Sequence, residues 1–336
     1  MTAIAPLPVA MPKYDIHQPP PFFEYVRLSD DSVPEARRDC VDVALLDMNH
    51  SWPNVGHDAL VHVVLEAADA LRDELERNGM KVRVLSHDVR RRNAVPASPN
   101  GRFQLYIGTG GPGHLDPRLN DGTDEHSQGV TESDAWEAPL FRLFDDILTD
   151  RTAAMIAVCH SFGLVCRWSG VAVPVLREEK SSGMPLNRLS REALQHPWFA
   201  QFSRALPDRQ HFRVMDNRLF DLILDTPGKS IPIAFEAASN TALTMIELAR
   251  DAAGTMPRFM GVNHHPEIID RDHIMQVLDE KRARGEVSDR WYEERAVTMR
   301  DLFRGEEERQ SQLTSHYTLI EPLRHHLERV IAERSS

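Results

Sequence analysis

The sequence lacks any long hydrophobic segment. No apolar run approaches the roughly 18 residues that a membrane-spanning helix needs, and residues 1–13 contain prolines but no basic stretch ahead of their apolar part. A secretory signal normally begins with such a basic stretch. We therefore expect a cytoplasmic protein that does not enter a membrane.

Cysteine is also scarce. The 336 residues include 3 cysteines, Cys40, Cys159 and Cys166, which leave one unpaired in any disulfide scheme and form no C-x-x-C motif. A reducing compartment fits this usage best. One of the three is therefore a candidate for chemistry rather than for a crosslink.

Positive charge is in the minority. The 51 acidic and 39 basic residues give a formal net charge of −12, and no basic run is denser than Arg90-Arg91-Arg92. Proteins that bind a phosphate backbone usually carry a basic surface. We therefore expect neither nucleic acid nor an anionic membrane as a partner.

Metal-binding motifs are missing as well. The sequence has 16 histidines, but it contains no H-E-x-x-H motif and no cysteine pair at zinc-binding spacing. Histidines without metal-binding spacing are more often packing or exposed side chains than ligands. We expect no metal and no cofactor.

What the sequence does contain is an alternation of strand-like and helix-like segments. Short apolar runs with the length of buried strands occupy residues 41–46, 82–85, 103–107, 153–158 and 258–262. Apolar residues at helical spacing lie between them, over residues 60–75 and 135–148. Repeated β-α-β units predict a parallel sheet with helices packed on it.

The remaining segments carry weaker signals. We predict strands at residues 171–176, 212–215, 219–224 and 231–235, a helix at 241–251 and a surface loop at 117–133. Residues 1–40 are predicted to be a proline-rich arm, because proline supplies no ladder donor and favours extended backbone. Residues 41–268 would form one α/β domain and residues 269–336 a helical extension. Packing helices explain the apolar stripes of that extension better than a partner surface does.

Two candidate chemical segments each follow a predicted strand. Residues 109–113 read Thr-Gly-Gly-Pro-Gly, and closely spaced glycines let backbone N–H groups face a ligand. Cys159 lies between a strand and a predicted helix, with the small residues Ala157 and Ser161 two positions to either side. That pattern is typical of a nucleophile elbow, although a turn and a buried structural cysteine remain alternatives.

A third segment, residues 261–267, ends in His-His-Pro-Glu. His265 could act as a base for a thiol and Glu267 could orient its ring, with His264 as the alternative base. An ordinary turn is the other interpretation. Ligands of parallel sheets bind beyond the carboxyl ends of the strands, so the three segments together predict one site that holds nucleophile, base, orienter and oxyanion donors.

These segments resemble the class I (triad) glutamine amidotransferases. That family has, in the same order, a Ser-Gly-Gly-Pro-Gly loop, a Gly-x-Cys-x-Gly-x-Gln elbow and a Gly-Val-Gln-Phe-His-Pro-Glu segment. The resemblance covers residues 41–268. It implies a flavodoxin-like, three-layer α/β/α fold with a mostly parallel sheet.

The resemblance also implies a role for each matched residue. Cys159 would be the nucleophile, His265 the general base and acid, and Glu267 its orienter. The backbone N–H groups of Gly111 and His160 would form the oxyanion hole. Gly110 and Gly113, in the glycine loop of residues 109–113, would bind substrate. The thiolate would attack the γ-carboxamide of glutamine or a γ-glutamyl compound, release ammonia and leave a thioester for water to cleave.

The partners implied are a small-molecule substrate and, for the ammonia, a separate acceptor or synthetase protein, because the chain shows no Gly-x-x-x-x-Gly-Lys-Ser/Thr loop. Gly163 stands where the family elbow has glutamine. Two alternatives therefore stay open. One is another Cys-His-Glu acyl-transfer enzyme, similar to a γ-glutamyl hydrolase or a homoserine acyltransferase, and the other is a scaffold of the same fold with weak catalysis.

Overall fold

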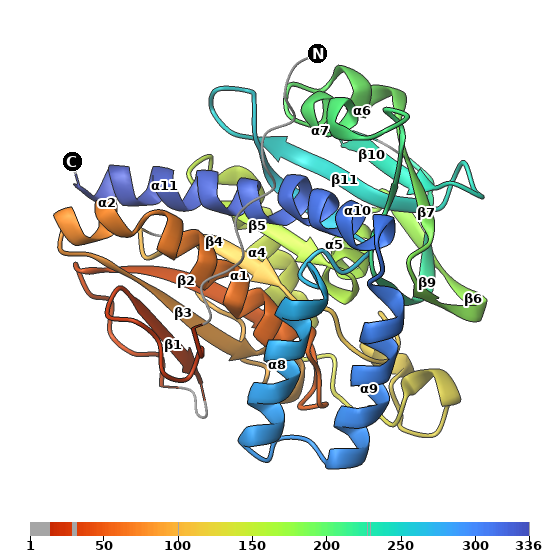
Figure 1. The fold of residues 1–336 in the computed structure, drawn as a ribbon, viewed down its shortest axis with the longest axis horizontal. Helices are drawn as coiled ribbons and strands as arrows, with labels where there is room; N and C mark the ends of the chain where they lie inside the picture. Colours follow the sequence, from red (N-terminus) through yellow and green to blue (C-terminus); the bar gives the residue numbers. More distant parts are fainter. Residues whose placement is uncertain (1–13, 29–31, 100, 227, 229, 336) are drawn as a thin grey trace.

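A ten-stranded sheet forms the centre of the molecule (Figure 1). The computed structural model describes residues 14–28, 32–99, 101–226, 228 and 230–335. In spatial order the strands are β1 (Phe23–Arg27), β3 (Lys81–Asp88), β2 (Cys40–Asp47), β4 (Phe103–Gly108), β5 (Ala154–Val158), β12 (Pro257–Val262), β11 (Leu243–Arg250), β10 (Ile231–Glu236), β7 (Leu186–Leu189) and β8 (His211–Arg213).

The sheet has a parallel part and an antiparallel part. Neighbouring strands run parallel from β1 to β12 and antiparallel from β12 to β8. A separate two-stranded antiparallel sheet consists of β6 (Ala172–Gly183) and β9 (Asp216–Leu224). The strands predicted between residues 171 and 235 are confirmed, and their antiparallel pairing is an addition to the predicted parallel sheet.

Helices cover both faces of the sheet. One buried apolar cluster joins α1 (Gly56–Ala70), α11 (Glu321–Ser335) and α7 (Phe199–Ala205) to one face, and a second joins α4 (Glu137–Thr149) and α5 (His160–Ser169) to the other. Apolar side chains at helical spacing form these contacts because they bring one stripe of each helix onto the sheet. The predicted three-layer α/β fold is confirmed.

The other helices are short or belong to the C-terminal region. They are α2 (Arg72–Arg77), α3 (Val89–Arg92), α6 (Arg191–Gln195), α8 (Arg271–Ala283), α9 (Asp289–Leu302), α10 (Glu306–Ser315), the 3₁₀ turns η1 (Pro117–Leu119) and η2 (Glu125–Ser127), and the π-helical turn η3 (His316–Ile320). Helices α8 and α9 pack on each other around a third apolar cluster. Among the described residues, no helix is both long enough and apolar enough to span a membrane.

One predicted helix is wrong. Residues 241–251 contain strand β11, which lies between β10 and β12. Because its first five residues are all buried, its apolar side chains do not alternate with polar ones. A short apolar run of this kind cannot be distinguished from a helix by periodicity.

The ends of the chain contribute to the central layers. Part of the proline-rich segment forms β1, which pairs with β3 at one edge of the sheet. Helix α11 lies along the sheet beside α1 (Figure 1). Domain boundaries at residues 40 and 268 stay a prediction, and residues 1–13 lie outside the described part.

Candidate active site

The three chemical segments lie side by side because of the strand order. Strands β4, β5 and β12 are neighbours and run parallel, so their carboxyl ends meet at one edge of the sheet. The glycine loop follows β4, Cys159 follows β5, and His265 follows β12. The structure therefore brings together the residues that the sequence analysis proposed for one site.

Cys159 occupies a strained turn between β5 and α5. Its backbone has φ 49° and ψ −102°, a conformation that residues other than glycine rarely adopt. Its N–H donates to the carbonyl of Val262 (2.8 Å), and its carbonyl accepts from the N–H of Gly163 (2.9 Å). Such a turn presents the side chain at the end of the sheet, as in a nucleophile elbow.

The helix after Cys159 can approach the strands only because a glycine lies beneath it. A Cβ atom on Gly261 would lie 2.2 Å from the ring of Phe162, which is far inside van der Waals contact. Phe162 is fully buried at this contact. The close packing of α5 on β12 holds the start of the helix, and with it Cys159, against the sheet.

His265 and Glu267 form a hydrogen-bonded pair next to Cys159. Nδ1 of His265 lies 2.8 Å from Oε1 of Glu267, whose side chain is fully buried. Burial disfavours the imidazolium, but the charges of Glu267 and Cys159 beside the ring outweigh it and raise the pKa of His265 well above its ordinary value. Nε2 of His265 has no nitrogen or oxygen partner among the described residues, so it is free to exchange a proton with the thiol.

Gly110 lies close to both the imidazole of His265 and the side chain of Cys159. A Cβ atom on Gly110 would lie 2.9 Å from Cε1 of His265 and 3.6 Å from Cβ of Cys159. A larger residue would therefore push the imidazole away from the nucleophile. Glycine at this position leaves the space in which the two side chains approach each other.

Two backbone N–H groups are suited to stabilise an oxyanion. Across the described segments, the N–H groups of Gly111 and His160 have no hydrogen-bond acceptor. Both residues line the same cavity as Cys159. An unpaired N–H at the start of a helix, next to the nucleophile, is the arrangement expected of an oxyanion hole.

Arg90 holds the glycine loop in place, a role that the sequence analysis missed. Its Nη1 donates to the carbonyls of Met48 (2.9 Å) and Pro112 (2.7 Å), and its Nε donates to Glu132 (2.9 Å). Both charged side chains are fully buried. Glu132 lies in the segment predicted to be a surface loop, so that segment has a buried anchor.

The site opens into a cavity of about 390 Å³. Cys159 and His265 line it, together with the cationic side chains of Lys180 on β6 and Arg295 on α9. Phe220 on β9 adds an aromatic wall. The cavity is therefore sized for a small ligand, and the cationic side chains of its wall, which also include Arg218, favour one that carries a carboxylate.

Gly163 also lines the cavity, and Leu115 packs against it where a side chain would otherwise lie. A Cβ atom there would lie 2.5 Å from both Cδ atoms of Leu115. The Leu115 side chain thus occupies the space that a larger residue at position 163 would fill. Leu115 therefore excludes a larger side chain at position 163 in this arrangement.

Two neighbours of the site residues, His264 and Ser161, are not placed to act as base or nucleophile. Burial, reinforced by the charges of His265 and Arg218, lowers the pKa of His264 to about 3. Ser161 is buried and donates to the carbonyl of Thr109 (2.7 Å). Within the described ranges, no group of three or more His, Cys, Asp or Glu side chains is arranged to hold a metal ion.

The α1 terminus next to Glu267 yields a test of geometry. A Cβ atom on Gly56 would lie 2.6 Å from Oε1 of Glu267. We expect Gly56→Ala to displace this carboxylate and to lower kcat by about 10- to 100-fold, since misplacement by about 1 Å has effects of that size. Steady-state kinetics check this, and Glu267→Asp in the same chain should restore part of kcat because its side chain is shorter. No recovery, or an unchanged kcat in Gly56→Ala, contradicts this account.

No protein-family model matches the sequence, and no curated protein matches it. Solved structures do match, at low sequence identity. A glutamine amidotransferase from Thermotoga maritima is 13% identical, with 87% of this chain and 98% of that chain covered and a TM-score of 0.49. A glutamine amidotransferase from Methylobacillus flagellatus is 14% identical, with 88% of this chain and 94% of that chain covered and a TM-score of 0.42.

Proposed function

We propose that this protein is a glutamine amidotransferase-like cysteine hydrolase that cleaves the γ-carboxamide of glutamine or of a γ-glutamyl compound. The observation that carries the proposal is the position of Cys159 in a strained elbow beside the His265–Glu267 pair. A thiol, a base with an orienting carboxylate, and free N–H groups are the parts that acyl transfer through a thioester needs.

The reaction follows from these positions. His265 carries the proton of the Cys159 thiol, and the Cys159 thiolate attacks the γ-carbonyl carbon. The N–H groups of Gly111 and His160 stabilise the oxyanion. His265 returns the proton to the leaving nitrogen as the C–N bond breaks, and ammonia departs. Water then attacks the thioester with His265 again as base, which releases the γ-carboxylate and the thiol.

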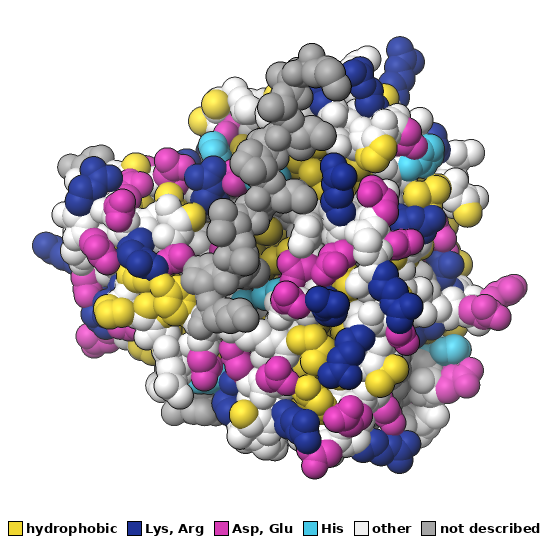
Figure 2. All heavy atoms as spheres, viewed as in Figure 1, with side chains coloured by type: hydrophobic (Ala, Val, Ile, Leu, Met, Phe, Trp, Pro, Cys, Tyr) yellow, Lys and Arg dark blue, Asp and Glu magenta, His cyan; other side chains and the backbone are white. Residues whose placement is uncertain are grey.

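Two further parts of the proposal concern the ligand and the ammonia. Lys180 and Arg295 line the cavity and would pair with the α-carboxylate of the substrate. The ammonia would pass to a separate acceptor or synthetase protein. On the face drawn in Figure 2, acidic and basic side chains are intermixed, without a broad area of one sign. The charges of that face therefore do not mark a docking surface for such a protein.

The test is the release of ammonia and the formation of glutamate from glutamine. We expect both products in equal amounts from the purified protein, and cleavage of γ-glutamyl anilide if the acyl group rather than ammonia determines specificity. Asparagine, which lacks one methylene, is the matched control and should react much more slowly. If none of these compounds is cleaved, with or without candidate acceptor proteins, the proposal is wrong.

The raised pKa of His265 predicts how the reactivity of Cys159 depends on pH. A raised pKa keeps the imidazolium at neutral pH, where it stabilises a neighbouring thiolate. Glu267→Gln removes a charge that raises this pKa, so the imidazolium should be lost at lower pH. We expect alkylation of Cys159 by iodoacetamide at pH 7 to slow by about 10-fold in this variant, because an ordinary thiol is only a few per cent ionised there.

Mass spectrometry of the Cys159 peptide over pH 5 to 9 measures this reactivity. The matched control is Glu192→Gln, an exposed glutamate on α6. It should leave the pH profile unchanged. Equal profiles for Glu267→Gln and the unmodified protein would show that Glu267 does not control the ionisation of His265.

A further inference from the structure

A second cavity lies beside the active-site cavity. It has a volume of about 470 Å³ and shares with the first cavity the wall formed by Trp52, Pro53 and Asn54. Neither Cys159 nor His265 lines it. The chemistry proposed above therefore leaves this cavity without a role.

Two carboxylates meet at one end of the second cavity. Asp47 and Asp88 are paired in register at the carboxyl ends of the parallel strands β2 and β3, and both line the cavity. Burial, together with the charge of Asp47, raises the pKa of Asp88. Asp88 has Arg92 at 3.8 Å, whereas in the described chain no lysine or arginine lies within 4 Å of the Asp47 carboxylate. Like charges held together in this way attract a cation.

Asn49 adds a third oxygen to the same end. Its amide nitrogen donates to Oδ1 of Asp47 (2.8 Å), its side chain lines the cavity, and the residue is only 3% exposed. The amide oxygen Oδ1 has no partner among the described residues. A buried acceptor without a donor is costly, so a donor from a ligand would stabilise it. An ammonium group has three N–H donors for these three residues.

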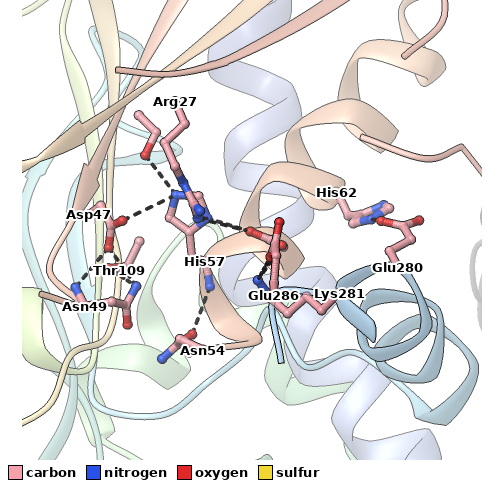
Figure 3. A network of polar contacts seen from close by, with 12 residues as sticks. Arg27, Asp47, Asn49, Asn54, His57, His62, Thr109, Glu280, Lys281 and Glu286 are labelled. Atoms are coloured by element: carbon pink, nitrogen blue, oxygen red, sulfur yellow. Dashed lines mark hydrogen bonds and ion pairs between the residues drawn. The ribbon is translucent and has the colours of Figure 1, made fainter. Parts of the chain in front are cut away.

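The other charges of the wall are already paired, with one exception. Lys281 lies 2.6 Å from Asp58, and Arg27 lies 3.5 Å from the same carboxylate. Figure 3 shows His57 between Asp47 on one side and Lys281 and Glu286 on the other. These contacts balance the charges of Lys281 and Arg27.

The exception is Arg91, an exposed residue of the cavity wall. Its Nη1 donates to Oγ of Ser51 (2.5 Å). It has no carboxylate within 4 Å in the part of the chain that the structure describes. The wall thus keeps a carboxylate, Asp47, that has the His57 ring at 3.8 Å but no lysine or arginine within 4 Å among the described residues. It also keeps a guanidinium, Arg91, without a carboxylate at that distance in the same part of the chain.

We propose that the second cavity binds a small zwitterion of the amino-acid class, with its ammonium group at Asp47, Asn49 and Asp88 and its carboxylate at Arg91. A ligand with one charge would satisfy only one end of the cavity. A ligand with both charges makes charge-assisted hydrogen bonds at both ends, which are the stronger kind.

The test uses Cys159→Ala, which prevents turnover without altering the second cavity. The standard L-amino acids are screened for an increase in Tm, and those that bind are titrated by calorimetry. We expect at least one to bind, and its decarboxylated amine and its deaminated acid to bind at least about 10-fold more weakly, the equivalent of one lost interaction of 1.4 kcal/mol. Equal binding of the amine overturns the zwitterion proposal.

Variants then place the bound amino acid. Asp47→Asn and Arg91→Gln should each weaken binding at least about 10-fold, whereas Phe220→Ala in the first cavity and Arg118→Gln at an exposed position should not. Circular dichroism checks that Asp47→Asn folds. Arg91 is exposed, so Arg91→Gln should fold normally and tests the proposal even if Asp47→Asn does not fold. Binding that is insensitive to both variants, or no binding by any amino acid, contradicts the proposal without affecting the one made for Cys159.

Discussion

Cys159→Ala should lower the rate of glutamine hydrolysis by at least about 10⁴-fold, because removal of a nucleophile from a triad has effects of that size. Alanine keeps the Cβ atom and the turn, whereas it lacks the sulfur that forms the thioester. The measurement is ammonia release at saturating glutamine. The affinity for substrate should change little, since the other residues lining the cavity remain.

The matched control for this variant is Cys166→Ala. Cys166 is fully buried on α5, and burial raises the pKa of its thiol well above the ordinary value. A protonated, buried thiol behaves as a small apolar group, so this variant should keep its activity. A comparable loss in both variants would show that the effect comes from disturbed packing of α5 and not from the nucleophile.

Arg90→Met should destabilise the protein by about 3–5 kcal/mol, which is the usual cost of removing one partner of a buried ion pair. The variant leaves Glu132 charged and buried, and it releases the carbonyl of Pro112 beside Gly111. We therefore expect lower activity in the fraction that still folds. Urea unfolding monitored by circular dichroism measures the change in stability.

Two further variants separate the ion pair from general packing effects. Arg92→Met changes an arginine that is 40% exposed and should have little effect. Arg90→Met combined with Glu132→Gln should be less destabilised than Arg90→Met alone, because no unpaired charge is then buried. If Arg90→Met is no worse than Arg92→Met, Arg90 does not hold the glycine loop in the way described.

Much of the site was accessible from the sequence because each chemical segment follows an apolar strand. The runs before Thr109 and Cys159 have the length and composition of buried strands, and a parallel sheet brings the ends of such strands to one edge. The relation of Cys159, His265 and Glu267 follows from that rule. Local sequence patterns are sufficient when the fold places them by a general principle.

Other features depend on contacts between distant segments. Arg90 looked like part of a basic run, and its buried pairing with Glu132 involves a loop that seemed exposed. Strand β11 looked helical because it is buried between two other strands. Arg295, from the C-terminal helices, reaches the active-site cavity only through the packing of α9. No local pattern in the sequence predicts such contacts.

The most direct test of the central claim is covalent labelling by a γ-diazoketone analogue of glutamine, followed by intact-mass measurement. We predict a single adduct on the unmodified protein and on Cys166→Ala, and none on Cys159→Ala. An adduct that persists in Cys159→Ala, or the absence of any adduct on the folded, unmodified protein, would contradict the assignment of Cys159 as the nucleophile of a glutamine-type site.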